Sequence, residues 1–375
     1  MRTKSFIAIF ILAVAFIFTS CENSAVDPTV DLGILPESFK VDVPGALSYT
    51  TTKSTGTKST NDDFEGQDIY QLLGLFIHVG EESAQLVEDI IYAISVHGIN
   101  KPMEISFVSD DDLRTKNLVV IDDAEFEGKL YDHAFTITDA ESEENADGGK
   151  AMQVFWNSNP VDGIAIIKPF NINRETSGVL LETMYRIEYT NKVTTSYDET
   201  MKVMISGLPL TAASADPFSI ETLQMFVGRK GDIVDVFGNS NHPNAYLIYN
   251  DDPGFNWAFV ASGYNSKNIG VAEVGLPPSD LNTTSRREIL EDYSIKQVFT
   301  DEINRYFIDN YSVQPDSAQL STLLQETEAP GYFANGGFVQ AGTMPDDNYI
   351  EIDSRIDNLT PFNPLEVSNL TLFFQ

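Results

Sequence analysis

The stretch between Met103 and Val274 consists of short runs rich in β-branched and aromatic residues, separated by turn-forming segments. These runs are 118–121, 134–138, 152–156, 164–170, 184–189, 201–205, 223–227, 233–237, 246–249, 257–262 and 269–274. Short connections such as Arg229-Lys230-Gly231 leave no room for the crossover that parallel strands require. The pattern therefore predicts a long antiparallel meander, and a sheet of that length tends to curl, close or fold over.

Both flanks of this β-rich region, 103–274, show the 3.6-residue apolar period of helices. In 68–98 we expect Gly80 to divide the segment into two helices and Gly98 to cap the second. The helical period returns over 279–327. Helices packed against an antiparallel sheet define an α+β domain, which is the fold class we predict.

The last part of the chain contains one glycine-rich stretch and one alternating stretch. The glycines of 331–338 favour an irregular loop. Apolar and polar residues alternate over 367–374, which predicts a final strand docked into the sheet. The predicted globular domain therefore covers 67–375.

Residues 21–66 are predicted to form a Ser/Thr-rich tether in front of this domain. Tyr49 is the only large apolar residue of its centre, 48–60, and such a composition buries too little apolar area to fold. The alternating stretch 38–43 is an exception that predicts a first strand. If that strand forms, the Ser/Thr-rich stretch is a loop within the domain and the tether is shorter.

The N-terminus has the pattern of an export signal. Arg2 and Lys4 precede an apolar run over 6–18, and small residues then lead to Cys21, the single cysteine of the chain. The run is shorter than the ~20 apolar residues that a membrane-spanning helix needs. We therefore expect residues 1–20 to be a signal peptide, and no later segment to reach membrane-spanning length.

The stretch Phe18-Thr19-Ser20-Cys21 resembles the signal of bacterial lipoproteins, although that family usually has an aliphatic residue in place of Phe18. The resemblance covers 1–21. It implies cleavage before Cys21, a diacylglycerol on its thiol and an acyl chain such as palmitate on its amine. It also implies a membrane partner through this anchor, in the cell envelope of a diderm bacterium. Glu22 favours the outer membrane over the periplasmic face of the inner one. The alternative is an ordinary secretory signal with Cys21 as a bystander.

Composition excludes several classes of protein. The chain has 56 acidic and 23 basic residues and a net charge of −33, whereas nucleic-acid recognition depends on Lys and Arg. We therefore expect no nucleic-acid partner. Hydrophobic residues make up 42% of the chain, which argues against disorder of the whole. The acidity favours solubility through self-repulsion, and a cationic partner is the alternative explanation.

The motifs of common enzymes and metal sites are missing from the sequence. The 4 histidines form neither HExxH nor a zinc-binding pair, and no Gly-x-Ser-x-Gly or phosphate-binding glycine motif occurs. The acidic clusters 110–112, 251–252 and 346–347 lack the spacing of an EF-hand loop. We therefore predict no metal, no cofactor and no catalytic residue. Dispersed carboxylates of a glycoside hydrolase remain an open alternative.

Aromatic residues of the β-rich region are the candidate ligand-binding residues. They are Trp156, Trp257, Tyr246, Tyr249 and Tyr264. Aromatic rings beside amides and acids suit sugar stacking, but aromatic residues on strands also build cores.

Three functions are consistent with these patterns. The first is a non-catalytic, lipid-anchored envelope protein whose β-rich domain binds a ligand or partner, such as a glycan, a lipid or an envelope protein. The second is a carrier of a lipid or other apolar ligand, which needs a cavity of several hundred Å³. The third is a surface hydrolase, which needs a cleft with paired carboxylates or a Ser/His pair within reach.

Overall fold

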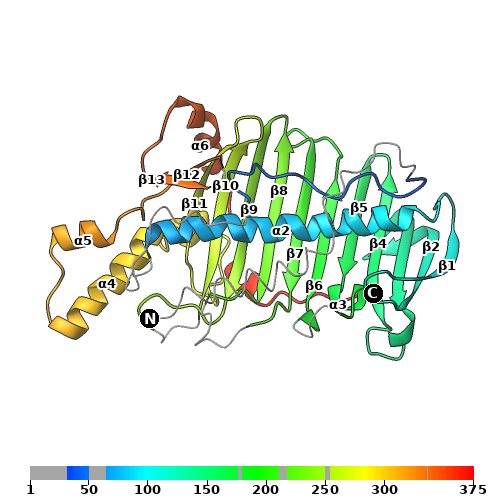
Figure 1. The fold of residues 1–375 in the computed structure, drawn as a ribbon. Coiled ribbons are helices and arrows are strands. Elements are labelled where there is room, and N and C mark those ends of the chain that lie inside the picture. The colour runs from blue at the N-terminus through cyan, green and yellow to red at the C-terminus, as the bar shows by residue number, and fades with distance from the viewer. Residues whose placement is uncertain (1–31, 50–64, 176–179, 211–217, 250–253, 336) are drawn as a thin grey trace. The chain divides into compact units, whose positions relative to one another are not determined.

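The computed structural model describes residues 32–49, 65–175, 180–210, 218–249, 254–335 and 337–375. Its strands form a 13-stranded sheet in which β1 to β13 follow one another in sequence order. Figure 1 shows these strands and the α2 helix, Gly66–Ser95. The predicted α+β class and the antiparallel meander are confirmed.

The strands divide between two compact units. The β1–β7 unit comprises the described residues of 10–41, 80–209 and 371–375, and the β8–β13 unit those of 42–79 and 210–370. Strands of the first are β1 Met103–Val108, β2 Thr115–Phe126, β3 Lys129–Asp139, β4 Lys150–Ser158, β5 Val161–Ile167, β6 Met184–Thr190 and β7 Glu199–Ser206. Strands of the second are β8 Thr222–Lys230, β9 Ile233–His242, β10 Phe255–Tyr264, β11 Ile269–Gly275, β12 Gly331–Ala334 and β13 Phe338–Ala341.

The helices lie before, between and after the strands. They are α2 Gly66–Ser95, η1 Ala140–Ser142, α3 Pro169–Ile172, η3 Arg287–Glu291, α4 Ile295–Tyr311, α5 Ser317–Leu323, η4 Asp347–Tyr349, α6 Ile350–Ile356 and α7 Pro364–Ser368. The helical prediction for 279–327 is confirmed by η3, α4 and α5. Asp316 begins α5 because its carboxylate accepts from the N–H groups of Ala318 and Gln319.

The predicted division of the first helical segment at Gly80 is wrong. α2 is one helix of 30 residues that continues through Gly80, and the Ser83 hydroxyl donates to the Gly80 carbonyl at 2.7 Å. A helical glycine costs about 1 kcal/mol. Burial of Ile77 and Ala84, both 0% exposed, outweighs that cost. Gly98 has a φ of +66° beyond the helix end, as a capping glycine should.

Residues 32–49 belong to the folded structure rather than to a tether. The stretch 38–43 is not a strand. Its apolar residues are nevertheless buried at alternate positions, since Phe39 and Val41 are fully buried. The Glu88 carboxylate of α2 accepts from the Phe39 N–H at 2.8 Å and from the Ser38 hydroxyl at 2.9 Å. These side-chain bonds replace a strand ladder. Of the predicted tether, 21–31 and 50–64 lie outside the described residues.

Two further predictions near the C-terminus are corrected. The stretch 331–338 is not an irregular loop but contributes β12 and the start of β13. The stretch 367–374 is not a strand, because Asn363 caps a helix that starts at Pro364 and the chain beyond it is neither helix nor strand. Periodicity alone did not reveal that Leu372 and Phe374 pack onto the face of strands rather than along an edge.

The β8–β13 unit is closed on one side by α6. Arg355 of α6 donates from Nε to Asp235 of β9 at 2.9 Å and pairs with the same carboxylate through Nη2. The Tyr332 hydroxyl donates to Asp353 at 2.9 Å. Ile352 and Ile356 enter the apolar cluster between α6 and the strands. Polar bonds at its rim therefore fix α6 in place over a buried core.

Candidate functional site

Both tryptophans are core residues. Trp156 is fully buried, and its indole N–H donates to the Ile34 carbonyl at 3.0 Å. Trp257 is also fully buried, with its ring centre 5.2 Å from that of Phe76 on α2. Neither ring face reaches the surface, so the structure offers neither tryptophan as a platform for a sugar.

The three predicted tyrosines are half-buried and lie in different surroundings. Tyr264 donates its hydroxyl to Glu351 of α6, and this bond, with burial, raises the pKa of Tyr264 to about 12. Tyr249 lies under the guanidinium of Arg305 on α4, 4.1 Å from the ring centre. Of the three, the structure therefore places Tyr249 against α4 and Tyr264 against α6, and it does not bring the five predicted aromatic residues together.

The stretch 246–249, predicted as a strand, is an irregular connection. The N–H groups of Ile248 and Tyr249 donate to the Glu302 carboxylate of α4 at 3.2 and 3.3 Å. A side chain of another element thus takes the place of a neighbouring strand.

A Ser/His pair that the sequence analysis did not find lies in β9. The Ser240 hydroxyl is 2.7 Å from Nε2 of His242, and Nδ1 of His242 is 2.8 Å from the Phe218 carbonyl. A carbonyl only accepts, so Nδ1 carries the proton and Nε2 accepts from the serine. Ser-x-His in a strand was the available signal, because residues two apart share a face.

This pair has the contacts of a nucleophile and its base, but it has no access to solvent. Ser240 and His242 are each 0% exposed, and burial lowers the pKa of His242 to about 4. The rings of Phe76, Phe255 and Trp257 surround the imidazole. Both imidazole nitrogens are satisfied, so the pair stabilises the core and is no active site in this conformation.

Each described acidic cluster has one residue with a structural contact. Asp112 accepts from Lys116 at 2.8 Å and Asp346 caps η4, whereas 251–252 lies outside the described residues. No group of three or more metal-ligating side chains occurs in the part of the chain that the structure describes.

The Asp139 side chain is the centre of a buried ionic network in the β1–β7 unit. It is 0% exposed and contacts Arg114 at 2.8 Å, Arg174 at 3.2 Å and Lys116 at 3.5 Å. Burial opposes its ionisation, but the hydrogen bonds from the two arginines and the lysine charge outweigh burial and lower the pKa of Asp139. The network ties β2 and β3 to the segment after α3.

The helices α4 and α5, with the turn between them, form an arm over 295–323 that Figure 1 shows extending away from the strands. One side of α4 is buried through Ile295, Phe299 and Ile303. At its C-terminal end, the rings of Tyr306, Phe307 and Tyr311 contact one another at centre distances of 5.7 to 6.1 Å.

This end of the arm is apolar and exposed. Tyr306 is 38% exposed, Ile308 46%, Tyr311 59% and Val313 56%. We call these four residues, with Phe307, the arm patch. The sequence analysis predicted helical structure over 279–327 but did not show which helix face remains uncovered.

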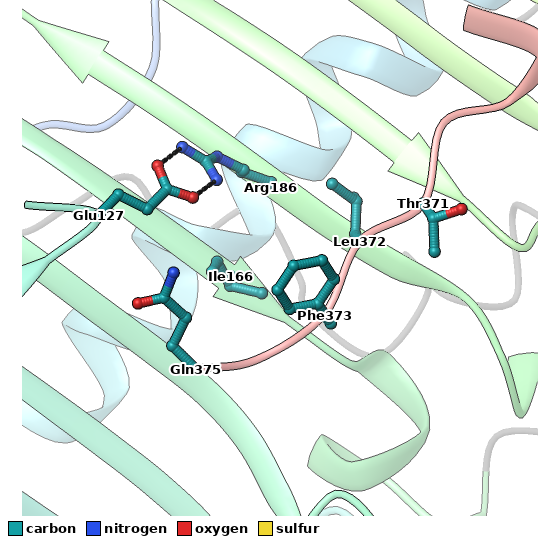
Figure 2. Close-up of a pocket in the computed structure, with 7 residues that line it drawn as sticks. All are labelled: Glu127, Ile166, Arg186, Thr371, Leu372, Phe373 and Gln375. Atoms are coloured by element: carbon teal, nitrogen blue, oxygen red, sulfur yellow. Dashed lines mark hydrogen bonds and ion pairs between the residues drawn. The ribbon is translucent and has the colours of Figure 1, made fainter. Parts of the chain in front are cut away.

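A second surface feature lies where the C-terminal segment crosses the β1–β7 unit (Figure 2). A hollow of about 40 Å³ is lined by Glu127, Ile166, Arg186, Thr371, Leu372, Phe373 and Gln375. Arg186 donates to both carboxylate oxygens of Glu127, at 2.6 and 2.7 Å. Ligand pockets usually measure ~300–1,000 Å³, so this hollow is too small for the cargo of a carrier.

Comparison with known proteins does not add a relative: no family model, no curated protein and no solved structure matches the chain. Among the described helices, none combines the length and the apolar character needed to cross a membrane.

Proposed function

We propose that this chain is a non-catalytic binding protein, anchored to the cell envelope through a lipid on Cys21, that docks a protein partner on the arm patch. The observation that carries the proposal is the ring cluster of Tyr306, Phe307 and Tyr311, in which both tyrosines are exposed. Tyrosines are enriched among the residues that dominate binding energy at protein interfaces. Contiguous apolar surface on a soluble domain commonly marks such an interface.

The charges around the patch favour a basic partner. Lys296 of the arm is paired with Glu328, and the guanidinium of Arg305 lies over Tyr249 and 3.9 Å from Asp309. Exposed acids such as Asp301 and Asp316 remain along the arm. A partner with an apolar centre and a rim of Lys and Arg is therefore complementary.

A second copy of the chain is a poor partner for the same reason. The net charge of −33 makes two copies repel, and the arm patch carries no basic residue of its own. The proposed complex therefore joins this chain to a different protein. The affinity of that complex should fall as the salt concentration rises.

The anchor is the second part of the proposal. Residues 1–31, including Cys21, lie outside the described residues. The bacterial-lipoprotein pattern ending at Cys21 supports attachment to the outer membrane, and two or more acyl chains hold a protein firmly. A lipid precursor should label the wild-type chain but not Cys21→Ser. Equal labelling of both would contradict the proposed lipid anchor, but it would not bear on the proposed partner site.

Site-specific photocrosslinking tests the partner site. A photoreactive phenylalanine analogue placed at Tyr311 in cells should give one adduct, whose protein is identified by mass spectrometry and then purified. The same analogue at Ile121, which is 48% exposed on β2, is the matched control and should not give that adduct. Tyr306→Ser should weaken binding of the purified partner at least about tenfold. Adducts only between copies of this chain, or the same adduct from Ile121, would contradict the proposal.

A further inference from the structure

The C-terminal segment Thr371–Gln375 lies in an extended conformation on one face of the β1–β7 unit, beside the hollow shown in Figure 2. Leu372 and Phe374 pack on an apolar floor. The floor consists of Ala124, Phe126, Tyr131, Ala134, Phe155, Ile166 and Met184. Phe373 between the two lines the hollow but is 67% exposed. The floor therefore takes every second side chain, which is the period of an extended strand.

We call this apolar floor, together with Lys150 and Gln153 at its end, the groove. Its polar end binds the backbone of Gln375 rather than the side chain of that residue. The Gln153 side chain accepts from the Gln375 N–H at 3.2 Å and donates to the Gln375 backbone oxygen at 3.2 Å. The Lys150 ammonium also donates to that oxygen. An amide side chain that bonds both the N–H and the oxygen of one residue does what a neighbouring strand would do. Any residue can therefore stand at this position.

We propose that this groove is a binding site for an extended peptide of a partner protein, with apolar residues at alternate positions, and that Thr371–Gln375 is its internal occupant. The segment itself shows the pattern that the groove would recognise. Leu372 and Phe374 pack on the floor, Phe373 between them is mostly exposed, and Gln153 accepts from the backbone N–H of Gln375. This site lies in the β1–β7 unit, so it is independent of the arm patch.

The occupant is held in a way that permits exchange. The segment is neither helix nor strand, and the inward side chains Leu372 and Phe374 are only half-buried. Attachment to the same chain gives it an effective concentration of about millimolar, which favours it over a free peptide of equal intrinsic affinity. A partner peptide with larger inward residues would displace it and cover the same floor.

The test uses a variant that ends at Leu370 and a fluorescein-labelled peptide of sequence Thr-Leu-Phe-Phe-Gln. Fluorescence anisotropy should show saturable binding at protein concentrations up to about millimolar. Asp in place of the peptide Leu or of its second Phe should weaken binding at least about tenfold, because a charge would enter the apolar floor. The matched control, Asp in place of the first Phe, should bind within about threefold of the parent because that residue faces solvent.

The complete chain is the second comparison. Its own segment should reduce peptide binding at least about tenfold relative to the variant that ends at Leu370. A full-length Leu372→Ser, Phe374→Ser variant keeps the chain length and should regain peptide binding. Adding Gln153→Ala to it should weaken binding again.

Three outcomes overturn the proposal. The first is a lack of binding by both variants while their circular dichroism matches that of the parent chain. The second is equal binding of the inward and outward Asp peptides. The third is loss of the folded spectrum by both variants, because the segment would then be an essential part of the core rather than an exchangeable occupant.

Discussion

The two units hold their buried polar groups by different means. In the β1–β7 unit, Asp139 is a buried anion that contacts the cationic side chains of Arg114, Lys116 and Arg174. The β8–β13 unit also has a buried carboxylate, Asp235, but it is paired with a single arginine, Arg355. Its other buried polar groups include neutral pairs, such as Ser240 with His242. A charged network is costly to break from one side, whereas a neutral one is disturbed when a proton is forced onto it. The units should therefore differ in their response to mutation and to acid.

The covers of the units differ as well. α6 is held over the β8–β13 unit by the pair of Arg355 with Asp235 and by the bond between Tyr332 and Asp353. The segment Thr371–Gln375 rests on the β1–β7 unit through two inward side chains and the backbone of Gln375. The ion pair and the hydrogen bond of α6 favour a permanent part of the fold. The few contacts of Thr371–Gln375 allow a ligand to replace this segment.

Each unit contains one of the 2 tryptophans of the chain, which gives each a fluorescent reporter. In a Trp257→Phe background, Trp156 reports on the β1–β7 unit. In a Trp156→Phe background, Trp257 reports on the β8–β13 unit. The predictions below use these two signals.

The largest expected effect is that of Asp139→Ala on the β1–β7 unit. It leaves Lys116, whose side chain is 3% exposed, as a buried charge without its Asp139 contact, and should lower the free energy of unfolding by about 3–5 kcal/mol. Urea unfolding followed by Trp156 measures this loss. The control is Asp162→Ala, which breaks the exposed pair with Lys129 and should cost no more than about 1 kcal/mol. Similar losses for both variants would contradict the prediction.

The next effect is acid loss of stability at His242. Its pKa is about 4 in the folded unit against an ordinary 6.5, so the unfolded chain takes up a proton first as the pH falls. The free energy of unfolding should therefore fall by about 3 kcal/mol between pH 6.5 and pH 4, with no further loss from this group below pH 4. Trp257 fluorescence in urea measures it.

His242→Gln should lack this dependence, although it is less stable at pH 7. The stability of the β1–β7 unit should depend on pH in a different, lower pH range. The pKa of Asp139 lies below its ordinary 3.8, so its contribution is present above that pH and is lost as the pH falls through the lower folded value. A pH dependence of Trp257 that persists in His242→Gln, or identical acid profiles for both tryptophans, would break the comparison between the units.

The strands were predictable from sequence and the polar interiors were not. The pattern of short runs, rich in β-branched and aromatic residues and separated by turn-forming segments, located most strands, because such side chains pack well on a sheet. It failed at 246–249, where Glu302 from α4 takes the backbone bonds, and at 367–374, where the inward residues meet a sheet face. Contacts between residues far apart in sequence leave no local pattern, as with Asp139 and Arg174.

The candidate site residues were also hard to predict, because their burial depends on contacts between residues far apart in sequence. Aromatic residue types pointed to Trp156 and Trp257, but residue type does not show which side of a strand is covered, and both are buried. The helical period predicted helices over 279–327, but it did not show that Ile295 and Phe299 form the buried side of α4. Exposure of Tyr311 at 59% depends on what packs around the arm, and only the three-dimensional structure contains that information.

A smaller effect is expected at the lightly held cover. Phe374→Ala removes one half-buried ring and should lower the free energy of unfolding of the β1–β7 unit by about 1–2 kcal/mol. The control is Phe126→Ala in the floor, where a 2% exposed ring is lost and about 3–5 kcal/mol is expected. Urea unfolding with Trp156 measures both. Equal losses would mean that the segment is as integral as the floor, and would remove the contrast with α6.

The smallest effect on stability is expected at the arm patch. Tyr311 is 59% exposed and contacts mainly Tyr306 and Phe307, so Tyr311→Ser should change the free energy of unfolding by less than about 0.5 kcal/mol. Trp257 reports on this unit. If the variant is as stable as the parent yet loses the partner, the ring is there for binding. A loss above about 2 kcal/mol would instead assign the three rings to the packing of α4, because a surface ring that serves only a partner has no such effect on folding.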